Sequence, residues 1–269
     1  MAKWLAALAV FVGATILMIA ALQTQMLFPT GAVGPPGPLP HGAVQVSLKT
    51  PDGNALYGIH IPPVTAQKQR TLVLGFGGNA WNGADVAAYL HQTFPQADIV
   101  AFHYRGYRPS TGSPSADALL ADAPLVHDFA VDRVKPERTI AVGFSIGSGV
   151  AASLAARRKL EGLILVTPFD SLKAAASDLY PWLPIGPFFE HEMNTAGFLK
   201  ASKLPVAVIA GEYDTLIRPA RTQALREQVA NLVYDRTIAG AGHNDIYHRP
   251  EFQQGMREAL AALGDRHER

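Results

Sequence analysis

The chain has 269 residues, of which 48% are hydrophobic and 17% charged, and its formal net charge is +1. These values suit one globular domain with a large core plus a further apolar segment, and they give no reason to expect a nucleic-acid partner. Because the chain has no cysteine, a disulfide framework, a thiolate zinc site and a cysteine nucleophile are excluded.

An apolar segment opens the chain. Trp4 to Leu22 is an uncharged run long enough to cross a bilayer as a helix, so residues 1–22 are predicted to be a transmembrane anchor. The alternative is a cleaved signal peptide, although Ile19-Ala20-Ala21 is a poor small-x-small cleavage site. Lys3 precedes the run, so the positive-inside rule predicts that the catalytic domain faces the periplasm or the outside of the cell. If the segment is a cleaved signal peptide, the protein is expected to be secreted.

A spacer and a hairpin are expected next. Residues 23–42 are rich in Pro and Gly and predict an extended spacer, with an ordered strap along the domain as the alternative for Met26 to Pro29. The main domain is predicted at 43–265. It begins with β-like runs at 43–48 and 55–61, which flank a Pro-Asp-Gly-Asn turn and indicate a hairpin.

Apolar strands and helical patterns alternate through the rest of the domain. Strands are expected at 71–76, 99–102, 140–142, 163–166, 206–210 and 232–238, and helices at 84–93, 117–131, 150–156, 219–229 and 244–263. This alternation is typical of an α/β fold in which a mostly parallel sheet carries helices on both faces.

Residues 169–204 interrupt the alternation with several prolines and an aromatic cluster. Such an insertion late in an α/β chain is a candidate lid. We expect Trp182, Phe188 and Phe189 to line an apolar substrate pocket beneath it. The alternative is a segment that only covers the edge of the sheet.

The pentapeptide Gly143-Phe144-Ser145-Ile146-Gly147 joins the strand at 140–142 to a run of small, helix-prone residues. A strand that enters a helix through G-x-S-x-G forms a nucleophile elbow, in which a strained serine presents its hydroxyl. Either glycine position would be crowded by a side chain. The turn also offers the backbone N–H of Ile146 to an oxyanion. The alternative is an ordinary glycine-containing turn between strand and helix.

An elbow serine needs an acid and a base, which follow it along the chain in that order. The strand at 206–210 leads into Asp214, and the strand at 232–238 leads into His243, so both residues should lie at the carboxyl edge of the sheet. Ser145 would attack, His243 would take its proton and Asp214 would orient the imidazole. Glu212 and Asp170 are the alternative acids.

A second oxyanion donor is expected in the loop Gly77-Gly78-Asn79-Ala80, which follows the strand at 71–76. The glycines let the backbone approach a substrate closely. The N–H of Asn79 is the first candidate and that of Ala80 the second. The sequence contains no metal-ligand spacing such as H-E-x-x-H, so no metal and no cofactor are predicted.

The chain contains the segments FGGNAWN, YRGYRPSTGSPSADALLADA, GFSIGSGVA, GEYDTLIRP and GAGHND in this order, with QMLFPT after the N-terminal run. Together they resemble the serine-hydrolase family of BEM46-like and ABHD12-, ABHD13- and ABHD17-type α/β-hydrolases. Gly77 stands where that family usually has histidine, and Arg108 replaces the glycine of its YRGYG motif. The resemblance extends over about residues 23 to 263 and implies the α/β-hydrolase fold and hydrolysis of an ester, thioester or lipid.

The sequence therefore predicts a membrane-anchored serine hydrolase that cleaves carboxylic esters or thioesters through an acyl-enzyme. Its partners would be a small-molecule or lipid ester and, through the N-terminal helix, a membrane. Two alternatives stay open. One is a serine peptidase of the aminopeptidase type, for which Glu190 or Glu192 would have to bind the substrate amine. The other is a catalytically silent binding module.

Overall fold

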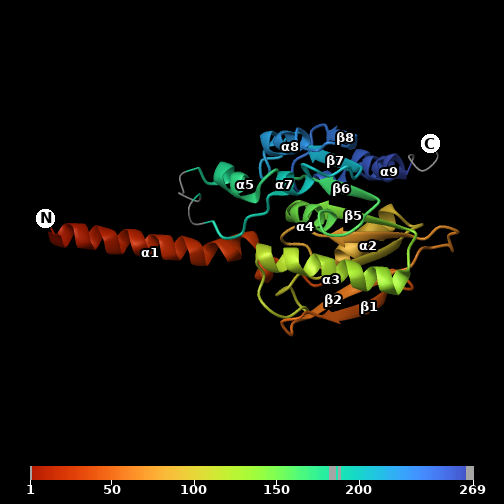
Figure 1. Cartoon of the computed structure of the whole chain (residues 1–269), viewed down its shortest axis with the longest axis horizontal. Coiled ribbons are helices and arrows are strands. Elements are labelled where there is room, and N and C mark those ends of the chain that lie inside the picture. Colours follow the sequence, from red (N-terminus) through yellow and green to blue (C-terminus); the bar gives the residue numbers. More distant parts are fainter. Residues whose placement is uncertain (1, 182–185, 187–188, 265–269) are drawn as a thin grey trace.

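The structure is a computed structural model that describes residues 2–181, 186 and 189–264 (Figure 1). Its centre is an eight-stranded sheet with the strand order β1-β2-β4-β3-β5-β6-β7-β8. The first two strands pair antiparallel, β2 also pairs antiparallel with β4, and the remaining pairs are parallel, as predicted. The strands are β1 (Val44–Lys49), β2 (Ala55–Ile61), β3 (Thr71–Phe76), β4 (Asp98–Phe102), β5 (Arg138–Phe144), β6 (Gly162–Val166), β7 (Val206–Gly211) and β8 (Leu232–Ile238).

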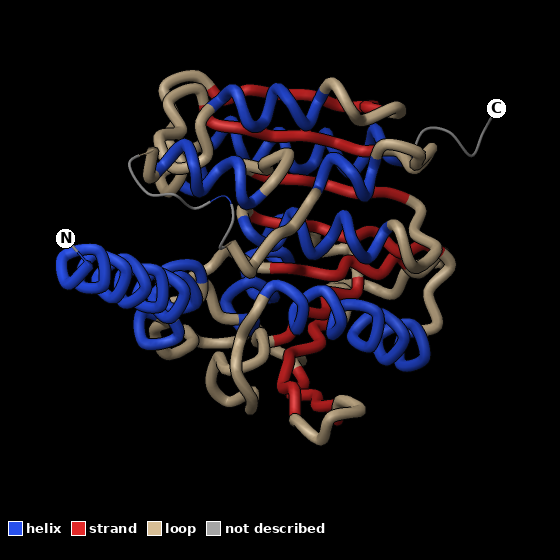
Figure 2. Tube along the Cα trace, turned by 60° about the vertical axis from the view of Figure 1, so that its left-hand side comes forward, coloured by secondary structure: helices blue, strands red, loops and turns tan. Residues whose placement is uncertain are grey.

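Helices cover both faces of the sheet (Figure 2). One face carries α2 (Gly83–Thr93) and α9 (Pro250–Gly264). The other carries α3 (Ala116–Val134), α4 (Ile146–Ala155), α7 (Thr195–Leu199) and α8 (Pro219–Arg226), and α5 (Leu172–Leu179) lies in the insertion between β6 and β7. The last helix begins at Pro250 rather than at residue 244. The intervening residues form a turn with a 3₁₀ segment, and proline is favoured in the first turn of a helix.

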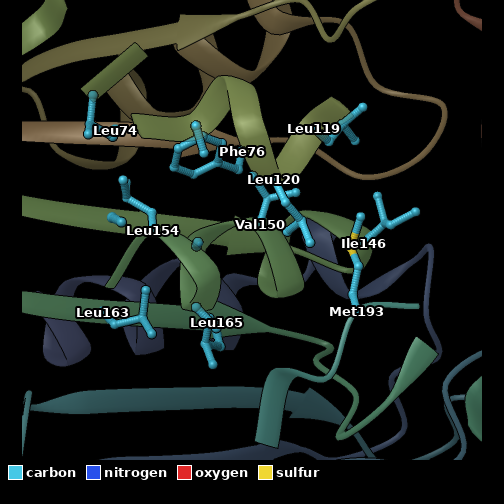
Figure 3. Close-up of a cluster of buried hydrophobic side chains, with 14 of the residues drawn as sticks. Leu74, Phe76, Leu119, Leu120, Ile146, Val150, Leu154, Leu163, Leu165 and Met193 are labelled. Atoms are coloured by element: carbon cyan, nitrogen blue, oxygen red, sulfur yellow. The ribbon is translucent and has the colours of Figure 1, made fainter. Parts of the chain in front are cut away.

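The two faces bury separate hydrophobic clusters, because successive side chains of a strand point to opposite faces. On the α4 face, Leu74 of β3 and Leu163 and Leu165 of β6 pack with Val150 and Leu154 of α4 (Figure 3). Every residue of β6 is buried, as expected for a parallel strand covered on both sides. This double cover fixes the central strands, whose carboxyl ends carry the site described below.

The N-terminal helix α1 (Ala2–Leu27) projects from the domain (Figure 1) and continues past residue 22, where the sequence analysis ended it. Many of its large apolar side chains are exposed, among them Trp4, Leu5, Leu8, Phe11 and Met18. A search of the described residues finds no helix with the length and apolarity needed to cross a membrane. The predicted transmembrane anchor, and the orientation derived from it, are therefore not supported.

The segment after α1 packs against the domain, as a strap does. Phe28 is 2% exposed and belongs to the core cluster of the α4 face. Further along, the carbonyl oxygen of Gly34 accepts a hydrogen bond from Asn82 Nδ2, and the N–H of Gly37 donates to Asp85 Oδ1 at 2.8 Å. These contacts hold the strap across the start of α2.

If Phe28 ties the strap to the core, Phe28→Ala should lower the free energy of unfolding by about 3–5 kcal/mol, because it leaves a buried cavity. Urea unfolding followed by circular dichroism measures this change. The exposed neighbour Gln25 provides the control, since Gln25→Ala should change the unfolding free energy little. A loss no larger for Phe28→Ala than for the control would contradict the docking of this segment.

Candidate active site

Ser145 occupies a strained turn between β5 and α4. Its φ is 51° and its ψ −116°, in a region that non-glycine residues seldom adopt. Its backbone N–H donates to the carbonyl of Val166 at 2.9 Å. A Cβ on Gly143 would lie 2.7 Å from the Cα of Ser148, and one on Gly147 would lie 2.6 Å from the carbonyl oxygen of Gly77. Both glycines are therefore required for α4 to approach β3 and β5 this closely.

The fold brings together the three side chains that the sequence analysis assigned to catalysis. His243 Nε2 lies 2.9 Å from Ser145 Oγ, and His243 Nδ1 lies 2.7 Å from Asp214 Oδ2. All three residues are less than a tenth exposed. The second carboxylate oxygen of Asp214 accepts the backbone N–H groups of Leu216 at 3.0 Å and Ile217 at 2.7 Å. The carboxylate is thus held at both oxygens while it faces the imidazole.

The loops that carry Asp214 and His243 are joined to each other. The N–H of Tyr213 donates to the carbonyl of Ala241 at 2.8 Å. Gly211, at the end of β7, approaches the same carbonyl so closely that a Cβ would lie 2.6 Å from it. Within the second loop, the N–H of Gly242 donates to Asp245 Oδ1 at 2.7 Å. The spacing of Asp214 and His243 is consequently set by backbone contacts.

The alternative acids have other partners. Asp170 lies 3.4 Å from the guanidinium of Arg221. Glu212 Oε2 accepts the backbone N–H of Gly240, and its side chain is exposed. The only carboxylate hydrogen-bonded to His243 in the described part of the chain is that of Asp214.

The two predicted oxyanion donors border the serine. Ile146 is the first residue of α4, where a backbone N–H has no partner within the helix. Asn79 lies in the loop after β3, and Asn79 and Ile146 line the same cavity as Ser145. Among the described residues, none accepts a hydrogen bond from the N–H of Asn79. Both residues therefore border the serine, and their N–H groups remain the predicted oxyanion donors.

Two tyrosines that the sequence analysis did not single out hold the Asn79 loop. Tyr104 donates its hydroxyl to the carbonyl of Gly77 at 2.8 Å, and Tyr107 donates to the carbonyl of Asn79 at 2.7 Å. Burial raises the pKa of both hydroxyls far above the usual range, so both remain donors. The YRGYR segment, already notable as a motif, was the available signal for these contacts.

A narrow cavity of about 130 Å³ opens on one side of Ser145. Its wall is mostly aliphatic and includes one face of α5 and the end of α1. The lining residues are Met26, Leu27, Asn79, Ser145, Ile146, Phe169, Leu172, Ala175, Ala176, Leu179, Tyr180, Leu216 and Ile217.

A wide cavity of about 790 Å³ opens on another side of Ser145 and includes His243. It is more polar than the narrow cavity. Its other lining residues are Gly78, Asn79, Ala80, Trp81, Tyr89, Gln92, Asn244, Tyr247, His248, Gln253 and Arg257. Trp81 and Tyr247 each pack edge to face against Phe144, the residue before the serine, and their rings are tilted against each other. Burial raises the pKa of Tyr247 to about 12, so its hydroxyl stays protonated. Ser145 thus lies where a largely aliphatic compartment meets a more polar one.

The predicted pocket residues fare differently. Trp182 and Phe188 lie outside the described residues. Phe189 is half-buried and packs against the core cluster of the α4 face. It is not among the residues that line the two cavities beside Ser145, so its role in a substrate pocket stays a prediction. The insertion also contributes α5, whose residues Leu172, Ala175, Ala176 and Leu179 follow the spacing of one helical face. That spacing was a signal for the pocket wall.

The carboxylate of Glu192, in the insertion, stabilises the start of α5. Glu192 accepts hydrogen bonds from the hydroxyl of Ser171 and the N–H of Lys173, both at 2.8 Å, and so helps to cap α5.

In the described part of the chain, no group of three or more His, Asp or Glu side chains is placed to hold a metal ion.

Comparison with known proteins identifies relatives of the whole domain. A family model described as alpha/beta hydrolase fold matches residues 72–189. The uncharacterised protein Rv2307c of Mycobacterium tuberculosis is 32% identical over 222 residues, which cover 81% of this chain and 76% of that protein. The lysophosphatidylserine lipase ABHD12 of Danio rerio is 25% identical over 227 residues, which cover 73% of this chain and 59% of the lipase.

The fold also matches solved structures. The esterase PF2001 of Pyrococcus furiosus superposes with a TM-score of 0.66 and 20% identity, over 85% of this chain and 97% of that structure. At this identity the likeness concerns the fold alone.

The tyrosine contacts lead to a prediction about turnover. Tyr107→Phe removes the hydrogen bond to the Asn79 carbonyl, so the N–H of Asn79 is aimed less well. We expect kcat for a p-nitrophenyl ester to fall about tenfold, as for one lost buried hydrogen bond. Because ground-state binding does not depend on this donor, KM should change by less than about twofold.

Tyr57, whose side chain is 40% exposed, provides the matched control, and Tyr57→Phe should leave both constants unchanged. Steady-state kinetics on the wild type, Tyr107→Phe and Tyr57→Phe shows whether the loss of the Tyr107 hydroxyl affects kcat or KM. A rise in KM at constant kcat would mean that Tyr107 shapes binding and does not position the loop.

Proposed function

We propose that this chain, which belongs to the ABHD-type family of α/β-hydrolases, is a serine hydrolase that cleaves carboxylic esters or thioesters of acyl groups. The observation that carries the proposal is the continuous hydrogen-bonded series from Ser145 through His243 to Asp214, with both contacts under 3 Å. Two backbone N–H groups border the same serine. This combination is what acyl transfer by a serine requires.

Each group has a defined task in the proposed reaction. Ser145 Oγ attacks the carbonyl carbon of the substrate while its proton moves to His243 Nε2. The former carbonyl oxygen, now negative, accepts hydrogen bonds from the N–H groups of Asn79 and Ile146. Asp214 holds the Nδ1–H of His243 and stabilises the imidazolium that forms.

Collapse of this intermediate breaks the bond between the carbonyl carbon and the leaving oxygen or sulfur. The leaving group takes the proton from His243 Nε2, and the acyl group stays on Ser145 Oγ. A water molecule then repeats the sequence, with His243 as its base, and releases the carboxylic acid. The proton taken from water returns to the serine, so the enzyme is regenerated.

The two cavities suit two different parts of the substrate, the acyl chain and the leaving group. The aliphatic lining of the narrow cavity suits an acyl chain, whereas the wide cavity presents polar groups, including Gln92 and Arg257, to the leaving group. One relative is named a lysophosphatidylserine lipase, an enzyme that acts on a lipid with one acyl chain and a polar head group. We infer that the substrate here is likewise an acyl ester with a polar leaving group.

The proposal predicts covalent labelling at one residue. A fluorophosphonate probe should label the wild-type chain, and Ser145→Ala should abolish the labelling and lower ester turnover by about 10⁵-fold. His243→Ala should be almost as damaging, and Asp214→Asn less so, because the three residues act as a unit. Gel fluorescence of the labelled protein and steady-state kinetics give the two readouts.

Two control variants make the test specific. Ser153 is a buried serine on the same helix α4, and Ser153→Ala should keep the labelling. Asp170→Asn should cost less activity than Asp214→Asn, and the opposite order would show that the acid is wrongly assigned. Full labelling of Ser145→Ala would reject the nucleophile, and absence of labelling in the wild-type chain would favour a silent binding module.

A further inference from the structure

The narrow cavity takes part of its wall from the N-terminal helix. Met26 and Leu27, the last residues of α1, line it together with Leu179 and Tyr180 at the end of α5. Most of α1 projects away from the sheet and its covering helices (Figure 1), yet its end reaches the compartment of the serine. A segment outside the hydrolase core therefore contributes to the site.

Contacts on both sides of Met26 and Leu27 fix their position. The Oε1 of Gln23 accepts the backbone N–H of Glu190 at 3.1 Å, and Thr24 Oγ1 lies 2.7 Å from His191 Nε2. After the helix, the buried ring of Phe28 packs edge-on against the His191 ring, with centroids 5.2 Å apart. The end of α1 is thus attached to Glu190 and His191 of the insertion, and it is held in place beside the cavity.

The two lining residues of α1 differ in their environment. Leu27 is half-buried and packs against the core cluster, so its replacement would disturb the fold. Met26 is 45% exposed and can be enlarged or shortened at little cost to packing. In a cavity of about 130 Å³, one larger side chain removes a substantial share of the space. A methionine also adapts its flexible thioether to chains of different shape.

We propose that the end of α1 is a wall of the acyl-binding site and that Met26 determines the length of acyl chain that the enzyme accepts. This inference rests on the proposed hydrolysis of acyl esters by Ser145. The aliphatic lining favours an unbranched acyl chain, which enters the narrow cavity beside Met26 while its carbonyl lies at the serine. The N-terminal segment is then a part of the substrate site.

The test uses the full chain in four forms: wild type, Met26→Trp, Met26→Ala and Leu22→Trp. Leu22 is the matched control, because it is an exposed apolar residue (43% exposed) one turn earlier on α1 and does not line the cavity. The measurement is kcat/KM for the p-nitrophenyl esters of acetate, butyrate, octanoate and dodecanoate.

Met26→Trp should lower the octanoate-to-acetate ratio of kcat/KM by about tenfold, the effect of keeping about two methylene groups out of an apolar site. Met26→Ala should raise the relative rate for dodecanoate. Leu22→Trp should give the wild-type profile. An unchanged profile in both Met26 variants would overturn the inference.

Two further readouts separate this inference from the proposed function. Fluorophosphonate labelling reports the nucleophile, so a wild-type chain that neither labels nor cleaves any ester refutes the proposed function. Titration calorimetry with decanoic acid reports the cavity without turnover. If decanoic acid binds Met26→Trp about tenfold more weakly than Leu22→Trp, the result supports Met26 as part of the wall of the acyl-binding site. Equal affinity for decanoic acid in all four proteins refutes it.

Discussion

The close approach of α4 to the central strands is the constraint on which the site depends. It needs glycine at 143 and 147, because a Cβ at either position would collide with backbone. It also holds Ser145 at a positive φ, a strained conformation that the surrounding buried strands maintain. The first N–H of α4 and the loop after β3 then lie beside the same hydroxyl. The proposed nucleophile and the proposed oxyanion donors are consequently products of one packing arrangement.

Sequence reasoning succeeded where the signal is local. The elbow, Asp214 and His243 each lie in the turn or loop that follows a parallel strand. Parallel strands bring their carboxyl ends to one edge, so the order of elements places all three together. The sheet and its helices were predictable for the same reason. The ends of helices were harder to predict from the sequence. The last helix was expected to start at residue 244, but the chain from Asn244 to Arg249 forms a turn, and α9 starts at Pro250.

Tertiary packing decided what sequence reasoning missed. Aromatic density in the insertion suggested Phe189 as a pocket residue, but a ring can equally pack against the core, as the half-buried Phe189 does. The narrow cavity beside Ser145 is lined by small and aliphatic residues of α5 and by Met26 and Leu27, which are far from α5 in the sequence. Likewise, only the folded loop shows that Tyr104 and Tyr107 donate hydrogen bonds to the backbone of the Asn79 loop.

We propose that Ser145 transfers an acyl group whose chain lies in the narrow cavity. A crystal structure of the full chain after reaction with an octyl phosphonofluoridate would show where the chain binds. We expect phosphorus bonded to Ser145 Oγ, a phosphoryl oxygen about 2.7–3.1 Å from the N–H nitrogens of Asn79 and Ile146, and the octyl chain between α5 and Met26. Phosphorus on another residue, or an octyl chain lying in the wide cavity, would contradict it.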